Sequence, residues 1–280
     1  MQDAPLIAAS ELAALQRSGA PLVLLDCGFD LADPGAGERA WAAGHIPGAI
    51  HAHLDRDLAG RPTGRNGRHP LPEAADWAAR VGRWGIAPGV RVVTYDAQGS
   101  PYAARAWWLL RWLGHDAVAV LDGGLAAWQA AGGALTREVG TVTARPPYPG
   151  RAGALPTIAV DALLERRGAL RILDARSADR YRGDAEPLDA AAGHIPGAVS
   201  RFFKLNLEAD GRFKPAATLR AEFEPLVAGA ATVVQQCGSG VTACHNLLAM
   251  MHAGLGVSTL YPGSWSEWSS DPSRPVARGA

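Results

Sequence analysis

At 280 residues, the chain is near the size at which one hydrophobic core usually splits into two domains. Lysine plus arginine and aspartate plus glutamate number 27 each, so no basic excess indicates nucleic acid or an anionic membrane as a partner. The three cysteines are an odd number in a long chain and do not suggest a disulfide framework, so we expect a reducing, cytoplasmic location. Residues 1–12 show no signal peptide, and no apolar stretch reaches membrane-spanning length.

Short apolar runs alternate with helix-like segments in the first half of the chain. We expect strands at Leu22–Asp26, Arg91–Tyr95 and Ala117–Leu121, and helices at Asp76–Trp84 and Tyr102–Leu113. This alternation is typical of α/β units, in which helices flank a parallel sheet. Ligands of such sheets bind beyond the carboxyl ends of the strands.

An internal repeat predicts the domain organisation. Four segments recur in the same order: 24–26 as 172–174, GHIPGA at 44–49 as 193–198, 92–96 as 233–237, and 121–128 as 261–268. The period is far longer than that of a solenoid repeat, so each copy is a whole domain. The proline-containing stretch between the copies fits neither a regular helix nor a central strand. We therefore expect domain 1 at residues 1–140, a connector at 141–156 and domain 2 at 157–280.

The second copy carries a cysteine where a strand is predicted to turn into a helix. The run Val233–Gln236 ends at Cys237, and apolar residues at helical spacing predict a helix over 243–255. The first N–H groups of a helix lack intrahelical partners and favour an anion. Gly238 and Gly240 allow the loop to curl with its N–H groups pointing inward. Such a site favours the nucleophilic thiolate, whereas the alternative is a buried, inert cysteine beside a turn.

The first copy differs at the same position. Asp96 stands where the second copy has Cys237, and the loop that follows (DAQGSPY, 96–102) is rebuilt around a proline. A carboxylate in a cradle for anions would repel an anionic substrate. We therefore expect the first domain to be catalytically silent.

Three motifs carry a family resemblance. CGSGVTA at 237–243 resembles the active-site loop of the rhodanese (sulfurtransferase) family, particularly its 3-mercaptopyruvate branch. GHIPGA at 193–198 resembles the second hallmark of that family, and YPGSWSEW at 261–268 resembles the C-terminal signature of its two-domain members. The resemblance implies two tandem rhodanese-like domains, each a parallel sheet flanked by helices, with the second domain catalytic.

The catalytic candidates are Cys237 and Ser239. The Ser239 hydroxyl could donate to a substrate carbonyl or to the sulfur, and the alternative is a small loop residue without a catalytic role. Thr242 is expected to stabilise the loop and the start of the helix through its hydroxyl. The loop residues expected to bind substrate are Gly238, Gly240, Val241 and Thr242.

Arg180 matches a position at which the family places a substrate-binding arginine, and a guanidinium suits a planar carboxylate. The alternative is a surface arginine in a helix. The 3-mercaptopyruvate branch often has a second arginine in a Glu-Pro-Arg context. Here Glu186 and Pro187 are followed by Leu188, so we expect a halved carboxylate clamp and a high Michaelis constant.

The remaining candidates have plain structural alternatives. The 3-mercaptopyruvate branch implies that His45 faces Ser239, but the recurrence of its motif around His194 favours a structural role for both histidines. Cys244 and Cys27 are expected to be buried core residues. No cysteine–histidine cluster has the spacing of zinc ligands, and neither a metal nor an organic cofactor is expected.

These residues predict a two-domain sulfurtransferase. The Cys237 thiolate takes sulfur from a small anionic donor, forms a persulfide and passes the sulfur to a thiol, a thioredoxin-like protein or cyanide. We expect 3-mercaptopyruvate to be preferred, because Gly238 and Ser239 are neutral where thiosulfate-specific members carry basic residues. The alternatives are a thiosulfate:cyanide sulfurtransferase and a non-catalytic sulfur- or protein-binding module. A tyrosine-type phosphatase is excluded, because Ala243 stands where its Cys-x5-Arg motif needs arginine.

Overall fold

The computed structural model describes residues 4–279, and the chain divides into two compact units. Unit 1 comprises Met1–Ala59, Pro72–Leu155 and Glu208–Phe213, and unit 2 comprises Gly60–Leu71, Pro156–Leu207 and Lys214–Ala280. The division between Leu155 and Pro156 falls inside the stretch 141–156. Two short segments do not belong to the same unit as the residues around them: Gly60–Leu71 belongs to unit 2, and Glu208–Phe213 belongs to unit 1. The first of these, Gly60–Leu71, contributes to the site described below. Within residues 4–279, no helix combines the length and the apolar character needed to cross a membrane.

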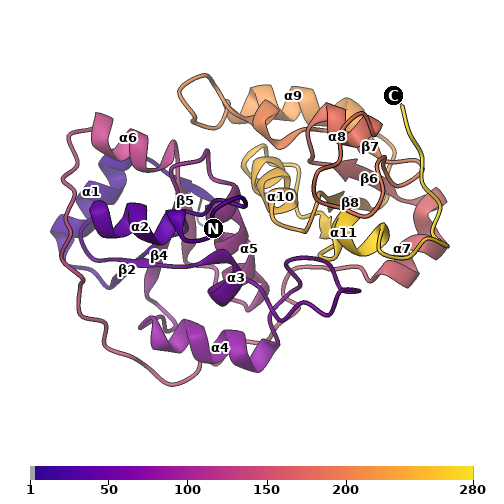
Figure 1. Cartoon of the computed structure of the whole chain (residues 1–280). Helices are drawn as coiled ribbons and strands as arrows, with labels where there is room; N and C mark the ends of the chain where they lie inside the picture. The colour runs from indigo at the N-terminus through magenta and orange to yellow at the C-terminus, as the bar shows by residue number, and fades with distance from the viewer. Residues whose placement is uncertain (1–3, 280) are drawn as a thin grey trace. The chain divides into compact units, whose positions relative to one another are not determined.

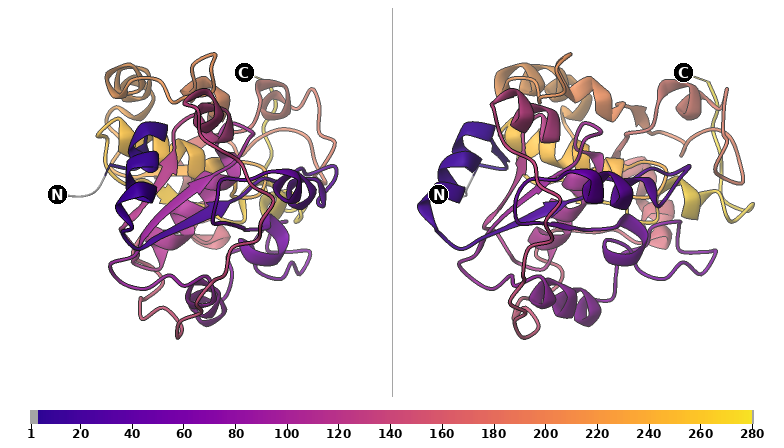
Figure 2. Two further views of the ribbon diagram at one scale, coloured as in Figure 1. Left: turned by 90° about the vertical axis from the view of Figure 1, so that its left-hand side faces the viewer. Right: turned by 60° about the vertical axis from the view of Figure 1, so that its left-hand side comes forward.

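Unit 1 is built on a parallel five-stranded sheet with the strand order β1-β5-β4-β2-β3 (Figures 1 and 2). The strands are β1 Leu6–Ile7, β2 Leu22–Asp26, β3 Ala49–His51, β4 Arg91–Tyr95 and β5 Val118–Leu121. The helices are α1 Ala9–Ser18, α2 Ala36–Ala43, α3 Leu54–Asp57, α4 Ala74–Arg83, α5 Pro101–Trp112 and α6 Gly124–Ala130. The expected parallel α/β architecture is confirmed.

Strand β4 is buried on both of its faces. Val93 and Tyr95 belong to a core cluster that also contains Trp128 of α6. Thr94, between them, points to the other face, where its Oγ1 donates to the carbonyl oxygen of Ala103 in α5 at 3.0 Å. Because helices cover both faces, apolar side chains of β4 are buried on each of them, and the polar Thr94 satisfies its hydroxyl within the protein.

Unit 2 repeats this plan with a parallel four-stranded sheet in the order β7-β6-β8-β9. Its strands are β6 Arg171–Asp174, β7 Val199–Ser200, β8 Val233–Gln236 and β9 Thr259–Leu260. Its helices are α7 Val160–Arg166, η1 Arg167–Ala169, α8 Ala178–Arg182, η2 Phe203–Asn206, α9 Ala216–Val227, α10 Thr242–His252 and α11 Ser264–Trp268. Leu163 of α7 and Trp265 of α11 pack with Val234 on one face, while α9 and α10 pack together on the other (Figure 1).

The two GHIPGA motifs fold alike. The Nδ1 of His45 lies 2.8 Å from the carbonyl oxygen of Trp41, and the Nδ1 of His194 lies 2.8 Å from that of Tyr181. Each imidazole also stacks on the ring of the same residue, with centroid distances of 4.4 Å and 3.9 Å respectively. Each histidine forms an antiparallel bridge to a later segment of its own unit. Both motifs therefore anchor a loop within their unit.

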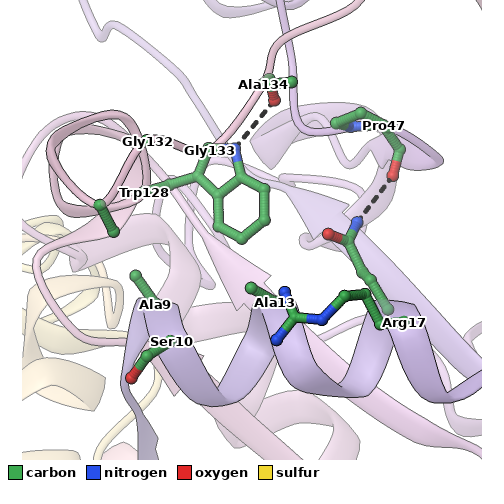
Figure 3. A pocket seen from close by; sticks show the side chains of 11 residues that line it. Ala9, Ser10, Ala13, Arg17, Pro47, Trp128, Gly132, Gly133 and Ala134 are labelled. Atoms are coloured by element: carbon green, nitrogen blue, oxygen red, sulfur yellow. Dashed lines mark hydrogen bonds between the residues drawn. The ribbon is translucent and has the colours of Figure 1, made fainter.

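Unit 1 has a surface hollow of about 640 Å³ beside α1 and the end of α6 (Figure 3). Trp128 lines it, and the indole Nε1 donates to the carbonyl oxygen of Ala134 at 2.9 Å. Gln16 Nε2 donates to the carbonyl oxygen of Pro47 at 3.2 Å. Arg17 is the one ionisable side chain among the lining residues, so the hollow offers no acid–base pair.

His53 caps helix α3 and must be neutral to do so. Its Nδ1 accepts from the N–H groups of Asp55 at 3.2 Å and Arg56 at 3.4 Å, and its Nε2 lies 3.0 Å from the carbonyl oxygen of Pro34. Burial lowers the pKa of His53 from its usual value, and the Arg56 charge lowers it further. The unfolded chain therefore binds this proton more readily than the folded protein.

We expect the stability contributed by His53 to be complete above the unfolded pKa of about 6.5 and to be lost as the pH falls through the lower folded pKa. His53→Asn retains an oxygen that can cap the helix but does not titrate. The thermal midpoint of this variant should therefore fall less than that of the wild type between about pH 7.5 and about pH 5.5. Identical pH dependence of the two midpoints would contradict this role.

Candidate functional site

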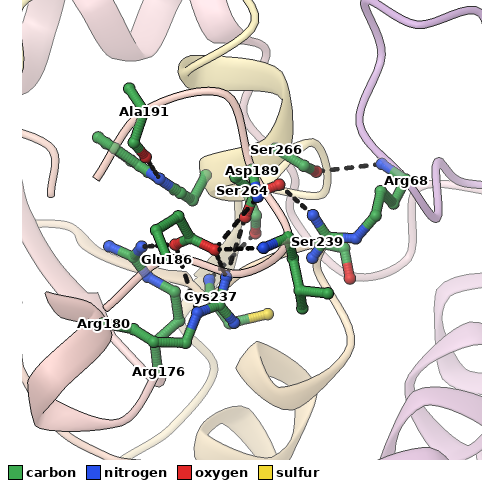
Figure 4. Close-up of polar contacts among 12 residues, drawn as sticks. Arg68, Arg176, Arg180, Glu186, Asp189, Ala191, Cys237, Ser239, Ser264 and Ser266 are labelled. Atoms are coloured by element: carbon green, nitrogen blue, oxygen red, sulfur yellow. Dashed lines mark hydrogen bonds and ion pairs between the residues drawn. The ribbon is translucent and has the colours of Figure 1, made fainter. Parts of the chain in front are cut away.

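Cys237 follows directly on β8, at the carboxyl end of a strand inside the unit 2 sheet. Its side chain is buried, and α10 begins five residues later, at Thr242. The N–H of Gly240 donates to Cys237 Sγ at 3.2 Å. The N–H of Cys237 donates to Ser264 Oγ at 3.1 Å (Figure 4). The thiol thus lies inside the loop that leads into the helix, with a backbone N–H pointing at it.

The curl of this loop depends on Gly240. Its φ is +76°, and a Cβ built on it would lie 2.3 Å from the carbonyl oxygen of Pro262. The segment after Pro262 also binds the loop, because Trp265 N–H donates to the carbonyl oxygen of Cys237 at 3.0 Å and Ser266 N–H to that of Gly238 at 2.8 Å. Any side chain at 240 would therefore have to separate the loop from α11.

Ser264 contributes a hydroxyl to the loop at a conformational cost. Its φ of +54° is in the left-handed region, which costs a residue with a Cβ roughly 1–2 kcal/mol. Gly124 is the matching residue of unit 1 and has a φ of +56° without that cost. Ser264 Oγ accepts from Cys237 N–H and donates to the carbonyl oxygen of Tyr261 at 2.9 Å, which offsets the strain.

Ser239 is hydrogen-bonded to a histidine that the sequence did not single out. Its Oγ lies 2.7 Å from Nδ1 of His69, and both side chains are buried. His45 is completely buried in unit 1, and its Nε2 lies 3.2 Å from the carbonyl oxygen of Glu138, which agrees with the structural role favoured for it over a contact with Ser239. His69 reaches the loop because Gly60–Leu71 belongs to unit 2.

Two arginines lie beside the loop. Arg180 of α8 binds Glu186 through Nη2 at 2.6 Å and Asp189 through Nη2 at 3.0 Å. Arg68, which the sequence also did not single out, forms an ion pair with Asp189 (Figure 4). A Cβ built on Gly238 would lie 3.1 Å from Arg68 Nη2 and 3.3 Å from Arg180 Nη1, so both guanidinium groups border the residue after the cysteine.

Arg176 has a structural role. Its Nη2 lies 2.7 Å from Asp174 Oδ2 and 2.8 Å from the carbonyl oxygen of Gly193, and its guanidinium lies 4.7 Å from the centre of the Trp265 ring. Burial works to lower the pKa of Arg176, but the ion pair with Asp174 outweighs burial and raises it. Arg176 thus connects β6 to the second GHIPGA motif.

Two further expectations can be compared with the structure. Helix α10 begins at Thr242 with Val241 at its cap position, and the role expected of the Thr242 hydroxyl stays a prediction. Cys27 and Cys244 are completely buried, as expected of core residues. Cys244 Sγ donates a hydrogen bond to the carbonyl oxygen of Gly240 at 3.4 Å and so connects α10 to the cysteine loop.

The corresponding loop of unit 1 is filled by its own carboxylate. Asp96 accepts hydrogen bonds from four N–H groups, those of Gln98, Ser100, Tyr102 and Ala103, at 2.8–3.0 Å. Burial raises the pKa of Asp96, and these N–H groups oppose the shift. The cradle that could hold a substrate anion is therefore occupied by a side chain of the protein. Among residues 4–279, no group of three or more His, Cys, Asp or Glu side chains is arranged to hold a metal ion.

Comparison with known proteins relates this geometry to a family. The model of the rhodanese-like domain matches residues 8–131 and 159–271. The chain is 48% identical over 286 residues to a Pseudomonas aeruginosa protein named "Probable 3-mercaptopyruvate sulfurtransferase", covering 100% of both chains. It is 32% identical over 270 residues to the thiosulfate sulfurtransferase of Gallus gallus, covering 92% of this chain and 90% of that protein. The structure of 3-mercaptopyruvate sulfurtransferase from Leishmania major matches with a TM-score of 0.83 at 32% identity, covering 94% of this chain and 74% of that one.

We expect Gly240→Ala to disrupt the loop, because the added Cβ meets a backbone oxygen as well as an unfavourable φ. Gly256→Ala is a matched control: its φ is +78°, and a Cβ there has nothing within 4 Å. Both variants should lose about 1 kcal/mol or somewhat more in unfolding free energy from the backbone conformation. Only Gly240→Ala should also lose at least about tenfold in Cys237 alkylation rate, measured with iodoacetamide. Equal alkylation rates in the two variants would show that Gly240 does not shape the thiol site.

Proposed function

This chain belongs to the rhodanese family and is a sulfurtransferase that uses 3-mercaptopyruvate or thiosulfate as its donor, and we propose that 3-mercaptopyruvate is preferred and that Cys237 carries the sulfur. The observation that carries the choice of donor is the 2.7 Å contact of Ser239 Oγ with His69 Nδ1, two residues from the cysteine. It supports a polarised hydroxyl for a ketone oxygen, which 3-mercaptopyruvate has and thiosulfate lacks.

The first half-reaction transfers one sulfur atom. The Cys237 thiolate attacks the thiol sulfur of 3-mercaptopyruvate, and the new S–S bond forms with the electron pair of the thiolate. The carbon–sulfur bond breaks, and its electron pair passes to the carbonyl, which leaves the enolate of pyruvate. The hydrogen carried by the transferred sulfur is released as a proton, and the enolate carbon takes up a proton to give pyruvate. No electron is left over, so the proposed step needs neither a metal nor an organic cofactor.

Ser239 and His69 act on the oxygen at which negative charge develops. A hydrogen bond from the Ser239 hydroxyl grows stronger as the ketone becomes an enolate, and such a bond accelerates the step. His69 holds the Ser239 hydroxyl in place and can supply a proton through it. Sulfite, the leaving group from thiosulfate, needs no such contact. Ser239 is therefore expected to distinguish the two donors.

The charges around the thiol also favour a monoanion. Arg68 and Arg180 are formally balanced by Glu186 and Asp189, which they contact. The residues that follow Cys237 are neutral, so the loop contributes backbone dipoles and no formal charge. A site without excess positive charge attracts a compact dianion such as thiosulfate less strongly than a basic loop would.

In the second half-reaction an acceptor removes the outer sulfur of the Cys237 persulfide. The acceptor is a thiol, a thioredoxin-like protein or cyanide, each of which attacks the outer sulfur and releases the Cys237 thiolate. The N–H groups that precede α10 stabilise the negatively charged persulfide until the acceptor binds. Because the two half-reactions are separated by a covalent intermediate, the kinetics are expected to be ping-pong. Unit 1, whose loop is filled by Asp96, takes no part in the chemistry.

We expect Cys237→Ser to abolish sulfur transfer without loss of fold, because a hydroxyl cannot form the persulfide. Cys244→Ser is the control, since Cys244 is buried in the same helix–loop region but does not carry sulfur. Mass spectrometry after incubation with donor should find an adduct of about 32 Da, one sulfur atom, on Cys237 only. A wild-type protein that never carries the adduct would instead favour a non-catalytic sulfur- or protein-binding module.

We expect kcat/KM to be higher for 3-mercaptopyruvate than for thiosulfate with the same acceptor. Ser239→Ala should lower kcat/KM for 3-mercaptopyruvate about ten- to a hundred-fold, the usual effect of losing a hydrogen bond to a charged group, and should change thiosulfate turnover much less. Ser273→Ala, at an exposed serine, is the control. A wild-type ratio in favour of thiosulfate would overturn the donor assignment, and an equal loss for both donors would overturn the role of Ser239.

A further inference from the structure

The end of the β8–β9 ladder lies directly beside Cys237. The two strands pair in parallel as far as Gln235 and Leu260, and beyond them the N–H of Tyr261 still donates to the carbonyl oxygen of Gln235 at 3.0 Å. In a regular parallel ladder, the next hydrogen bond would run from the N–H of Cys237 to the carbonyl oxygen of Tyr261. The position of the cysteine therefore depends on whether the ladder closes at this point.

A hydroxyl group stands between these two backbone groups. Ser264 Oγ accepts from the N–H of Cys237 at 3.1 Å (Figure 4). The same hydroxyl donates to the carbonyl oxygen of Tyr261 at 2.9 Å, and Ser264 is completely buried. A hydroxyl can donate and accept at once, so it satisfies both backbone groups without letting them meet. The end of the ladder is thus held open by one oxygen atom.

The open ladder bears on where the thiol lies. Directly after Cys237 the loop curls back, so that the N–H of Gly240 points at Cys237 Sγ at 3.2 Å. The carbonyl oxygen of Cys237 accepts from the N–H of Trp265 at 3.0 Å, and the N–H of Cys237 is bound by Ser264. Both polar backbone groups of the cysteine are therefore held by α11, and the hydroxyl sets how far Cys237 lies from Tyr261.

The backbone of Ser264 has a conformation that favours glycine. Its φ is +54°, and the matching residue of unit 1, Gly124, has a φ of +56°. A Cβ built on Gly124 would lie 2.2 Å from the carbonyl oxygen of Asp96, so the turn of unit 1 has no room for a side chain. The turn of unit 2 accommodates one, although the left-handed conformation lowers stability. Strain of this kind beside a reactive group indicates a functional reason for the side chain.

We propose that Ser264 is a positioning residue for Cys237. Its hydroxyl keeps the end of the β8–β9 ladder open and so holds the thiol in its reactive position, and the backbone strain is tolerated for this contact. The inference rests on the proposed function in taking Cys237 as the residue that carries the sulfur. Ser264 acts on the reaction through Cys237 and not through the donor.

Two substitutions at position 264 separate the hydroxyl from the strain. Ser264→Gly removes both, and the N–H of Cys237 can then close directly onto the carbonyl oxygen of Tyr261. Ser264→Ala removes the hydroxyl but keeps the strain, and its methyl group leaves both backbone groups without a partner. The thermal midpoint should therefore be higher for Ser264→Gly than for Ser264→Ala. The reverse order, or a Ser264→Gly protein that does not fold, overturns the proposal.

The kinetic test compares Ser264→Gly with Ser269→Ala in single-turnover experiments with 3-mercaptopyruvate. Ser269 follows α11, and its buried hydroxyl has no hydrogen-bond partner among residues 4–279, so this control loses the same group without losing a contact. Ser264→Gly should slow persulfide formation at saturating donor at least about tenfold and change the half-saturating donor concentration less than about twofold. Ser269→Ala should match the wild type. An unchanged rate in Ser264→Gly, or an equal loss in Ser269→Ala, overturns the proposal.

Two readouts do not depend on the donor. Alkylation of Cys237 by iodoacetamide should be at least about fivefold slower in Ser264→Gly than in the wild type. A crystal structure of this variant should show the nitrogen of Cys237 about 3 Å from the carbonyl oxygen of Tyr261. An unchanged alkylation rate, or a ladder that stays open, overturns the role of Ser264.

The proposed function fails by different results. A wild-type enzyme that prefers thiosulfate, or that never carries sulfur on Cys237, refutes the proposed function. The alkylation rate and the crystal structure of Ser264→Gly then still decide whether Ser264 positions the thiol.

Discussion

Backbone N–H groups at the turn from a parallel strand into the next helix need an acceptor, and both halves of this protein are organised by how they meet that need. In unit 1, Asp96 satisfies four of these groups with its own carboxylate, and the loop is closed to outside anions. In unit 2, the acceptor seen in the structure is the sulfur of Cys237. Loops at matching positions of the two units therefore meet the same need differently, one with a carboxylate of its own and one with the sulfur of a cysteine.

Acidic residues organise the cationic part of the site. Buried carboxylates next to an anion-binding centre would be expected to weaken it, yet Glu186 and Asp189 hold the two arginines that border the loop. Fixing a long side chain in this way removes rotamer freedom before the donor arrives, so less entropy is lost on binding. The two carboxylates thus lower the net positive charge of the site, but they also hold its arginines in fixed positions. Fixed positions favour donors of a particular shape more than they favour anions in general.

Much of the fold and the centre of the site could be predicted from local sequence, and the parts that could not depend on long-range packing. The apolar runs at Leu22–Asp26 and Arg91–Tyr95 and the strand–cysteine–glycine pattern at 233–240 are local signals, and the structure has strands at those positions. His69 and Arg68 lie in a turn-rich loop whose own sequence does not show that it folds with unit 2. Without that information, the only histidine considered as a partner for Ser239 was His45, for which the repeated motif already favoured a structural role.

The assignment of Gly60–Leu71 to unit 2 also bears on how the molecule can have evolved. A duplication of one domain begins as two separable modules, each with its own complete set of side chains. Here the half that contains Cys237 takes its histidine from the sequence of the other half, so a fragment that starts after the connector would keep the nucleophile and lose His69. The first copy carries Asp96 at the matching position, and its sequence supplies a segment of the site that the second copy does not contain. Separating the two halves of the chain would therefore separate His69 from Cys237 and remove part of the site.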